Sequence, residues 1–353
     1  MIQLLLRLKL RHSRAGGNPH PANPWMTACA GMTGRPHGLI AAALLIASTA
    51  SAQGVAWVTS EKDNALTLIA MDTMTVIGTV PTCKRPRHIR LTPGRKTLLT
   101  ACGDSHQGDL IDVATRKSVG KLPMGEDPEA FDLSPDGKTL YVSSEEAGEL
   151  AVLDAATGKK IRAVKVGEEP EGVLASPDGK VVYVTSEVAS LVHVVDPVAG
   201  KVLKNIAVGK RPRRFALTPD GAQLWVTSEL GASVTVLSTK DYSVMGMVKF
   251  EIKGVRAQDI TPVGIAMTKD GKRAFVTLGQ ANQVAFVDVA TRQVTNTVLV
   301  GKRAWNVSLN KAEDRLWVVN GLSDDVTVID VAAAKALKSI PVGRVPYGAL
   351  LVE

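Results

Sequence analysis

Tyr183-Val-Thr-Ser-Glu187 is one of seven short apolar strands that recur along this sequence. The other six begin at the equivalent positions Trp57, Leu99, Tyr141, Trp225, Phe275 and Trp317. Successive copies start 42 positions apart, except for one interval of 50. A repeat of this length is typical of a four-stranded propeller blade. We therefore expect an all-β chain that folds as a seven-bladed β-propeller with four strands in each blade.

Each repeat also carries the turn residues that such a blade needs. Ser134-Pro-Asp-Gly137 ends an expected inner strand, where proline presets φ and glycine supplies a positive φ for a tight turn. The same turn recurs from Ser176 and Thr218, and in a weaker form from Thr268. Because these carboxylates repeat with the fold, we interpret them as turn residues and not as catalytic groups.

The two ends of the repeat region each hold part of one blade. Val55 to Thr59 matches the second strand of a repeat without its first strand, and Pro346 to Leu351 matches an inner strand without its blade. We expect these N-terminal and C-terminal strands to pair and close the ring. Closure would remove the free sheet edges that otherwise invite aggregation.

Composition and charge agree with a packed domain and argue against a nucleic-acid partner. Hydrophobic residues make up 45% of the 353 positions, and the formal net charge is +8. Residues 1–52 contribute five basic and no acidic side chains, so only +3 remains on the repeat region. A basic patch large enough to bind nucleic acid is therefore not expected from bulk charge.

The N-terminal region has the layout of a secretory leader. Residues 32–52 hold a short basic segment, an apolar run and a small-residue cleavage site before Gln53, as in a signal peptide. The apolar run is too short to span a bilayer. We expect residues 1–31 to be a non-native extension, with an extended leader as the alternative. Residues 53–353 would then be a single propeller, located in the periplasm or secreted after cleavage near Ala52-Gln53, with no membrane span.

Three motifs give the chain a resemblance to a known family. The Tyr-Val-Thr-Ser strand, the Ser-Pro-Asp-Gly turn and the linker Val166-Gly-Glu-Glu-Pro170 resemble those of YVTN-family β-propeller repeat proteins, over essentially all of residues 55–353. Within that family the chain is most similar to propellers associated with pyrroloquinoline quinone-dependent alcohol catabolism. The resemblance implies an accessory, non-catalytic role beside quinoproteins, and it transfers no catalytic residues.

Blade geometry indicates where a binding site would lie. In an antiparallel blade, the linker entering the first strand and the loop leaving the second strand lie on one face of the disc. The mixture of charge and aromatic rings expected there is suited to a small polar or anionic ligand, or to a protein partner in the periplasm. The candidate face comprises Arg85, Arg87, His88, Glu129, Glu171, Arg211, Arg213, Arg214, Arg303, Trp305, Tyr347, Glu61, Glu145, Glu187 and Glu229. The alternative is that these arginines and glutamates pair with each other and only set the linker conformation.

Three further features break the repeat. Cys83 and Cys102 are expected on the same face, where they would form a disulfide in an oxidising compartment, with two reduced thiols as the alternative. The long repeat has its extra residues near 249–262, so Phe250, Arg256 and Asp259 are candidate contacts for a ligand or partner, or part of a tolerated loop. His88 has no second histidine at ligand spacing, so no metal and no cofactor are predicted.

The sequence leaves three functional hypotheses open. The first is a monomeric, non-catalytic secreted propeller that binds a partner or small ligand. The second is a propeller enzyme or electron-transfer subunit of the amine dehydrogenase, lactonase or haem-binding kind. The third is a structural repeat protein of the cell envelope.

Overall fold

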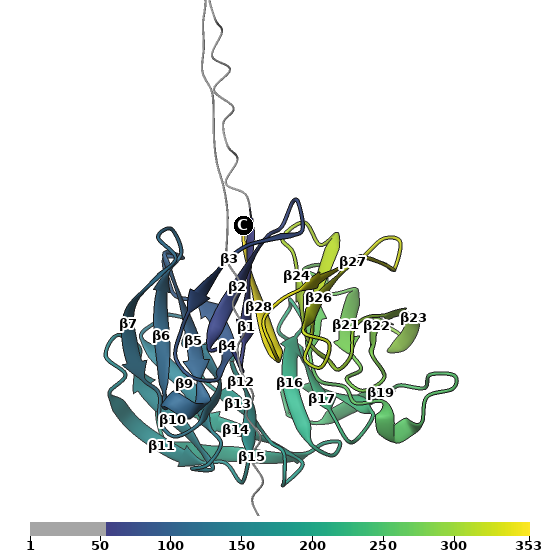
Figure 1. Cartoon of the computed structure of the whole chain (residues 1–353). Coiled ribbons are helices and arrows are strands. Elements are labelled where there is room, and N and C mark those ends of the chain that lie inside the picture. The colour runs from purple at the N-terminus through teal and green to yellow at the C-terminus, as the bar shows by residue number, and fades with distance from the viewer. Residues whose placement is uncertain (1–53) are drawn as a thin grey trace, which may run out of the picture. The chain divides into compact units, whose positions relative to one another are not determined.

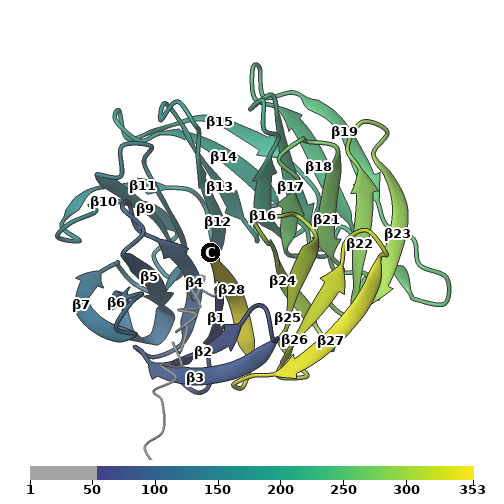
Figure 2. The same ribbon diagram turned by 90° about the horizontal axis from the view of Figure 1, so that it is seen from above.

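The computed structural model describes residues 54–353, which form 28 strands in seven antiparallel sheets of four. Figure 2 shows that, in the sheets whose strands are labelled, one edge strand lies near a central axis and the opposite edge strand lies at the periphery. The prediction of an all-β, seven-bladed propeller is confirmed. The predicted extension and signal peptide lie outside the described residues. Between residues 54 and 353, no helix has the length and apolar character needed to cross a membrane.

The blades are numbered here from the N-terminus, and each is given from its inner to its outer strand. Blade 1 contains β28 (Pro346–Val352), β1 (Val55–Ser60), β2 (Ala65–Ala70) and β3 (Thr75–Pro81). Blade 2 contains β4 (Pro86–Leu91), β5 (Thr97–Cys102), β6 (Gln107–Asp112) and β7 (Lys117–Pro123). Blade 3 contains β8 (Pro128–Leu133), β9 (Thr139–Ser144), β10 (Glu149–Asp154) and β11 (Lys160–Lys165). Blade 4 contains β12 (Pro170–Ala175), β13 (Val182–Ser186), β14 (Leu191–Asp196) and β15 (Lys201–Ala207).

The remaining blades follow the same plan. Blade 5 contains β16 (Pro212–Leu217), β17 (Gln223–Ser228), β18 (Ser233–Ser238) and β19 (Val244–Lys249). Blade 6 contains β20 (Ile265–Met267), β21 (Arg273–Thr277), β22 (Gln283–Asp288) and β23 (Gln293–Leu299). Blade 7 contains β24 (Ala304–Leu309), β25 (Arg315–Asn320), β26 (Asp325–Asp330) and β27 (Lys335–Pro341). Two short 3₁₀ turns, Gly103–Ser105 and Ala257–Asp259, lie in loops.

The last strand of the chain closes the ring. β28 pairs antiparallel with β1, with Val55 opposite Val352 and Trp57 opposite Leu350. Figure 1 shows β28, in yellow, beside the purple β1. The pairing predicted from the incomplete repeats is therefore present, and blade 1 is built from both ends of the repeat region.

The hydrophobic core is divided among the interfaces between neighbouring blades. Trp57 packs between blades 1 and 2, Trp225 between blades 5 and 6, and Trp317 between blades 7 and 1. All three side chains are essentially fully buried. The second strands therefore stabilise the ring by packing blade against blade, and these indoles do not form a cofactor cage.

A bulge follows the proline at the start of five inner strands. In β16, pairing with β17 shifts register between Pro212 and Phe215, and the same shift occurs in β4, β8, β12 and β28. A bulge leaves residues unpaired and bends the strand, so it redirects side chains. The residues in these bulges are Arg87 and His88, Glu129 and Ala130, Glu171 and Gly172, Arg213 and Arg214, and Tyr347 and Gly348.

Candidate functional site

The linkers and the loops that leave the second strands meet at one end of the channel. Arg85, Arg211 and Arg303, which end their linkers, have φ of 56°, 55° and 62°. This left-handed conformation is uncommon for residues other than glycine. The Glu229 N–H donates to the Arg211 carbonyl at 2.8 Å, and equivalent bonds are present in blades 1, 2, 3, 4 and 7. The expected common face is therefore formed by direct backbone contact.

A cavity of about 390 Å³ opens at this end, and it is called the linker-face pocket below. Ten of the predicted face residues line it, and they are Glu61, Arg85, Arg87, Glu145, Glu171, Arg211, Arg213, Arg303, Trp305 and Tyr347. Gly321, Leu322, Val345 and Pro346 complete the lining. Glu129, Glu187 and Glu229 do not line the pocket but pair with arginines that do.

One half of the pocket is built around Arg213, whose side chain is only 4% exposed. Its guanidinium pairs with Glu187, and it lies 3.2 Å from Glu229 and 3.5 Å from Glu171. Arg303 reaches the same Glu229 at 2.6 Å from blade 7. Blades 4, 5 and 7 are therefore connected by buried ion pairs.

The other half is built around Glu129, which is fully buried. Arg87 donates to it at 2.6 Å, and the Arg85 guanidinium also pairs with it. Arg87 lies 3.7 Å from Glu61 of blade 1. The pairing of charges across blades that the alternative expects is therefore present, and the pocket is lined by side chains that are already held in place.

Two aromatic rings form the wall between these halves. Arg303 and Arg213 lie over the Trp305 ring, with the guanidinium carbons 4.4 and 5.0 Å from the ring centroid. Arg87 lies 4.4 Å from the Tyr347 centroid. The Tyr347 hydroxyl donates to Glu171 at 2.8 Å. Such cation–π contacts restrict the arginines further.

The two central carboxyl groups titrate in opposite directions. Burial raises the pKa of Glu129 well above its ordinary value, and the lowering effect of Arg87 is smaller. Burial also acts to raise the pKa of Glu171, but Arg213, Arg214 and Arg87 outweigh it and lower that pKa to about 2. The two carboxyl groups therefore lie in electrostatically different environments at the mouth of the channel, one dominated by burial and the other by arginines.

Exposure separates the groups that a ligand can reach from those that position them. The side chains of Arg211, Arg85 and Glu145 are 42%, 24% and 30% exposed. The side chains of Arg213 and Glu171 are 4% and 3% exposed. Ligand contact therefore falls to the outer set, and the inner set holds it in position.

One acidic cluster at the mouth has the spacing of a metal site. Carboxylate oxygens of Asp127, Glu129 and Glu145 lie within 4.8 Å of one another. The Arg85 guanidinium pairs with all three residues, at 3.0 Å for Asp127 and 3.8 Å for Glu145. Arg85 thus supplies the positive charge that the cluster needs, and the cluster is part of the ion-pair network.

His88 and Arg214 were predicted on the charged face, and the structure places them elsewhere. Both line a second cavity of about 300 Å³, farther along the inner strands, which is called the inner chamber below. Tyr347 lines both cavities, and its hydroxyl donates to Glu171, which lines the linker-face pocket. The bulge explains the difference, because it turns two consecutive residues to different levels of the channel.

The insertion does not contribute to either cavity. Phe250 was predicted to be a candidate contact for a ligand or partner. It is 3% exposed and packs in the core between blades 5 and 6, so this prediction is wrong. Arg256 and Asp259 pair with each other, with Nε 2.6 Å from Oδ2. Neither residue lines the linker-face pocket or the inner chamber. The extra residues partly extend the core, which the sequence pattern did not indicate.

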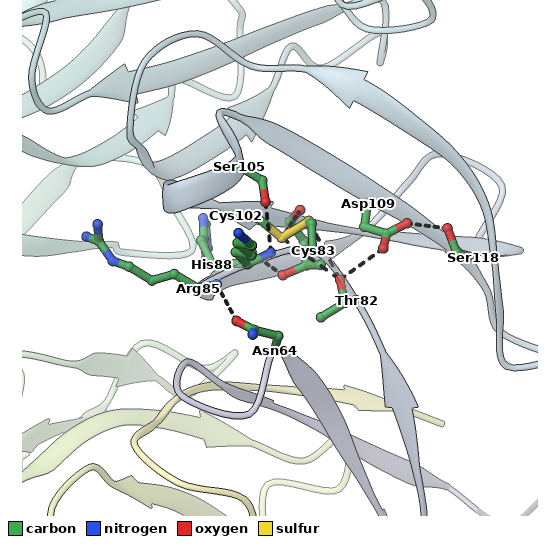
Figure 3. Close-up of a disulfide and its surroundings, with 11 residues drawn as sticks. Asn64, Thr82, Cys83, Arg85, His88, Cys102, Ser105, Asp109 and Ser118 are labelled. Atoms are coloured by element: carbon green, nitrogen blue, oxygen red, sulfur yellow. Dashed lines mark hydrogen bonds between the residues drawn. A yellow bond between two sulfur atoms is a disulfide. The ribbon is translucent and has the colours of Figure 1, made fainter.

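Cys83 and Cys102 form a disulfide that anchors the linker of blade 2 (Figure 3). Beside it, the Lys84 N–H donates to Ser105 Oγ at 2.8 Å, and the Arg85 N–H donates to Asn64 Oδ1 at 3.0 Å. The disulfide therefore fixes the backbone from which Arg85 and Arg87 reach the pocket.

Removing this disulfide should lower the free energy of unfolding by about 3 kcal/mol, because it closes a loop of roughly 20 residues in the unfolded chain. Chemical denaturation of the wild type with and without dithiothreitol measures the effect. The double variant Cys83→Ala, Cys102→Ala is the control, and its stability should not change with reductant. An equal stability of oxidised and reduced wild type would contradict the prediction.

Sequence reasoning did not identify the apolar contribution of the strand exits. Leu322 lines the pocket and is 69% exposed, and Leu230 and Val188 occupy the equivalent positions in blades 5 and 4 with 60% and 57% exposure. Aligning the residue five places after each second-strand start would have revealed these three apolar positions on the charged face.

Comparisons with known proteins support the fold and no finer assignment. Residues 144–318 match a family described as the choice-of-anchor I domain, and residues 105–178 match the YNCE-like beta-propeller family. No curated protein matches the sequence.

Similar solved structures include two enzymes and one protein of unknown function. Hydrazine synthase of Kuenenia stuttgartiensis is 22% identical with a TM-score of 0.69, covering 78% of this chain and 92% of that one. The periplasmic gluconolactonase of Pseudomonas aeruginosa is 20% identical with a TM-score of 0.72, covering 85% and 99%. A functionally unknown protein from Desulfotomaculum acetoxidans is 15% identical with a TM-score of 0.72, also covering 85% and 99%. At these identities the likeness shows the propeller fold alone.

Proposed function

We propose that this protein is a non-catalytic binding propeller, and that its linker-face pocket holds a small polar molecule with at least one anionic group. The observation that carries the proposal is the set of three partly exposed arginines, Arg85, Arg211 and Arg303, around one cavity with Trp305 in its wall. Arginine forms charge-assisted, geometrically specific bonds to carboxylate and phosphate groups. Because buried glutamates and aromatic rings hold these arginines, a ligand would meet a pre-organised site.

The protein acts in an oxidising compartment under this proposal. The leader-like sequence of residues 32–52 and the disulfide both favour an oxidising compartment, so we place the protein in the periplasm or outside the cell. The resemblance described above supports an accessory role in quinoprotein-linked alcohol catabolism. A protein partner docking on the same face is the alternative occupant.

Native mass spectrometry of protein purified from its own periplasm tests the proposal. A small molecule that stays bound under native conditions and is released by denaturation would support it, and its mass would identify the ligand class. An absorbance spectrum of the same sample distinguishes the binding protein from a cofactor-dependent enzyme. A haem or quinone band would contradict a cofactor-free binding protein.

Replacing Arg211 by methionine should weaken binding of the ligand recovered in that experiment by on the order of 10- to 100-fold, the effect of one lost charge-assisted hydrogen bond. Isothermal titration calorimetry measures the change. Lys210→Met is the matched control, because Lys210 is an exposed cation next in sequence that does not line the pocket. Equal affinities for the two variants would argue against Arg211 as a ligand contact.

A further inference from the structure

The inner chamber is set apart from the linker-face pocket by its chemistry. Its polar lining comes from His88, Arg214, Asn306, Ser308 and Tyr347. Its apolar lining comes from Ile89, Phe215, Ile265, Val307, Ala349 and Leu350. About 300 Å³ corresponds to roughly ten water volumes and lies at the lower end of ligand-pocket sizes.

Three of the polar side chains occupy one position of the repeat. His88, Arg214 and Asn306 are each the second residue after the linker proline or its equivalent, in blades 2, 5 and 7. The other four blades carry Ala130, Gly172, Gly264 and Gly348 at this position. At this level the chamber is therefore lined by three polar side chains, and the other four blades contribute only alanine or glycine.

The charge of Arg214 is already compensated. Its guanidinium lies 2.8 Å from Glu171 Oε1 and also donates to the Tyr347 hydroxyl. A second contact runs from Nη1 to the Glu171 carbonyl at 3.2 Å. The Arg214 side chain is 13% exposed, against 42% for Arg211 in the linker-face pocket. An anion entering the chamber would have to displace the buried Glu171 from this arginine, so the chamber does not favour anions.

His88 presents an uncharged donor. Its Nδ1 accepts the Phe131 backbone N–H at 3.0 Å, which requires Nδ1 to be unprotonated. The proton of the neutral ring is therefore on Nε2, and Nε2 has no hydrogen-bond partner among residues 54–353. Burial, followed by the charges of Arg214 and Arg90, lowers the pKa of His88 well below its ordinary value and outweighs the opposing effect of Glu171.

Asn306 presents the complementary acceptor. Its Nδ2 donates to the Tyr347 carbonyl at 2.8 Å, which leaves Oδ1 without a partner in the described part of the chain. One free donor and one free acceptor thus belong to side chains that line a cavity whose remaining walls are mainly aliphatic and aromatic.

We infer that the inner chamber is a second binding site, for a compact uncharged molecule with an apolar body and a hydroxyl or carbonyl oxygen that accepts a hydrogen bond from His88 Nε2. This inference does not depend on the proposed function, because it concerns a different cavity and the opposite ligand charge.

Titration calorimetry with cyclohexanone and with cyclohexanecarboxylate tests the inference on the mature wild-type protein. We expect saturable binding of cyclohexanone and at least about 10-fold weaker binding of the carboxylate, because burying an uncompensated charge is costly. No saturable binding of cyclohexanone, or tighter binding of the carboxylate, would overturn the inference.

The variant His88→Asn identifies the donor. Asparagine Oδ1 is attached at the same point as imidazole Nδ1, so it keeps an acceptor for the Phe131 N–H while the Nε2 donor is lost. Asparagine is also the residue that blade 7 uses at this position. We expect cyclohexanone affinity to fall about 5- to 10-fold, the effect of one neutral hydrogen bond.

His106→Asn is the matched control. His106 Nδ1 also accepts a backbone N–H, from Asp127 at 3.0 Å, but His106 does not line the chamber. Asn64 and Asn282 make the equivalent contact in blades 1 and 6. Affinity should equal that of the wild type, and an equal loss in both variants would overturn the role of His88. If His88→Asn does not fold, the wild-type His88 Nε2–H resonance must shift on cyclohexanone addition, and an unchanged resonance would refute the contact.

Discussion

Replacing Arg213 by methionine should lower the free energy of unfolding by about 3–5 kcal/mol, the usual result of removing one partner from a buried ion pair. Arg213 is 4% exposed and pairs with Glu187, Glu229 and Glu171. Methionine fills much of the same volume, so the loss reports the three carboxylates left without their shared cation. Guanidinium denaturation at pH 7 measures the difference.

Arg211→Met separates this effect from simple loss of charge. Arg211 contacts Glu187 at 2.7 Å and Glu229 at 3.2 Å, but its side chain is 42% exposed. Arg213 still neutralises both glutamates in this variant. We expect a loss of at most about 1 kcal/mol, as for exposed ion pairs. Equal losses in the two variants would show that burial does not decide the energetics of this network.

The stability difference between the wild type and Arg213→Met should also depend on pH. Arg213 is the main favourable influence on Glu171, whose pKa falls from the ordinary 4.5 to about 2 against the effect of burial. A lowered pKa contributes stability above the unfolded-state value, and that contribution is lost as the pH falls toward the folded-state value. The stability difference between wild type and Arg213→Met should therefore shrink from pH 5 to pH 3. A difference that grows on acidification would contradict this assignment.

Deleting residues 346–353 should abolish cooperative folding of the propeller. The deletion removes β28, the inner strand of blade 1, together with the buried Tyr347. β1 would lose its partner and present an open edge to solvent and to other molecules. A whole strand contributes more than the net stability of about 5–15 kcal/mol that domains of this kind have. Circular dichroism during heating should show no cooperative transition, and size-exclusion chromatography should show aggregates.

A permuted chain is the control for this deletion. Residues 346–352 are moved ahead of Val55 and joined to it by a copy of the turn Ser134-Pro-Asp-Gly137, as the inner and second strands of blade 3 are joined. The permuted chain has the same β28–β1 pairing with a local connection, so it should recover cooperative unfolding. A truncated chain that unfolds at the wild-type temperature would contradict the role of ring closure.

The repeat in the sequence predicted the fold, its closure and the face on which the linkers meet. These features depend on turn residues and strand patterns that recur every 42 positions, so each copy supports the others. It also brought Cys83 and Cys102 together, because both lie at the same end of one blade.

The repeat did not predict how the site is divided. Strict alternation along a strand does not foresee that Arg213 faces the linker-face pocket and Arg214 the inner chamber, since the bulge after Pro212 changes the register. It did not foresee that Phe250 joins the core, because an insertion has no equivalent residue in other blades. The sequence also did not predict which arginine pairs with which glutamate. These ion pairs join different blades, and the sequence of a single repeat carries no information about them.

The pairing of β1 with β28 also decides how the molecule responds to mechanical load. Val55 and Val352, near the two ends of the described chain, lie opposite each other in one sheet. Hydrogen bonds between antiparallel strands run perpendicular to the strands. A force that pulls these ends apart therefore breaks the bonds one after another, from Val55 toward Ser60, instead of loading them all together. We therefore expect blade 1 to open before the other six blades when the molecule is pulled from these two ends.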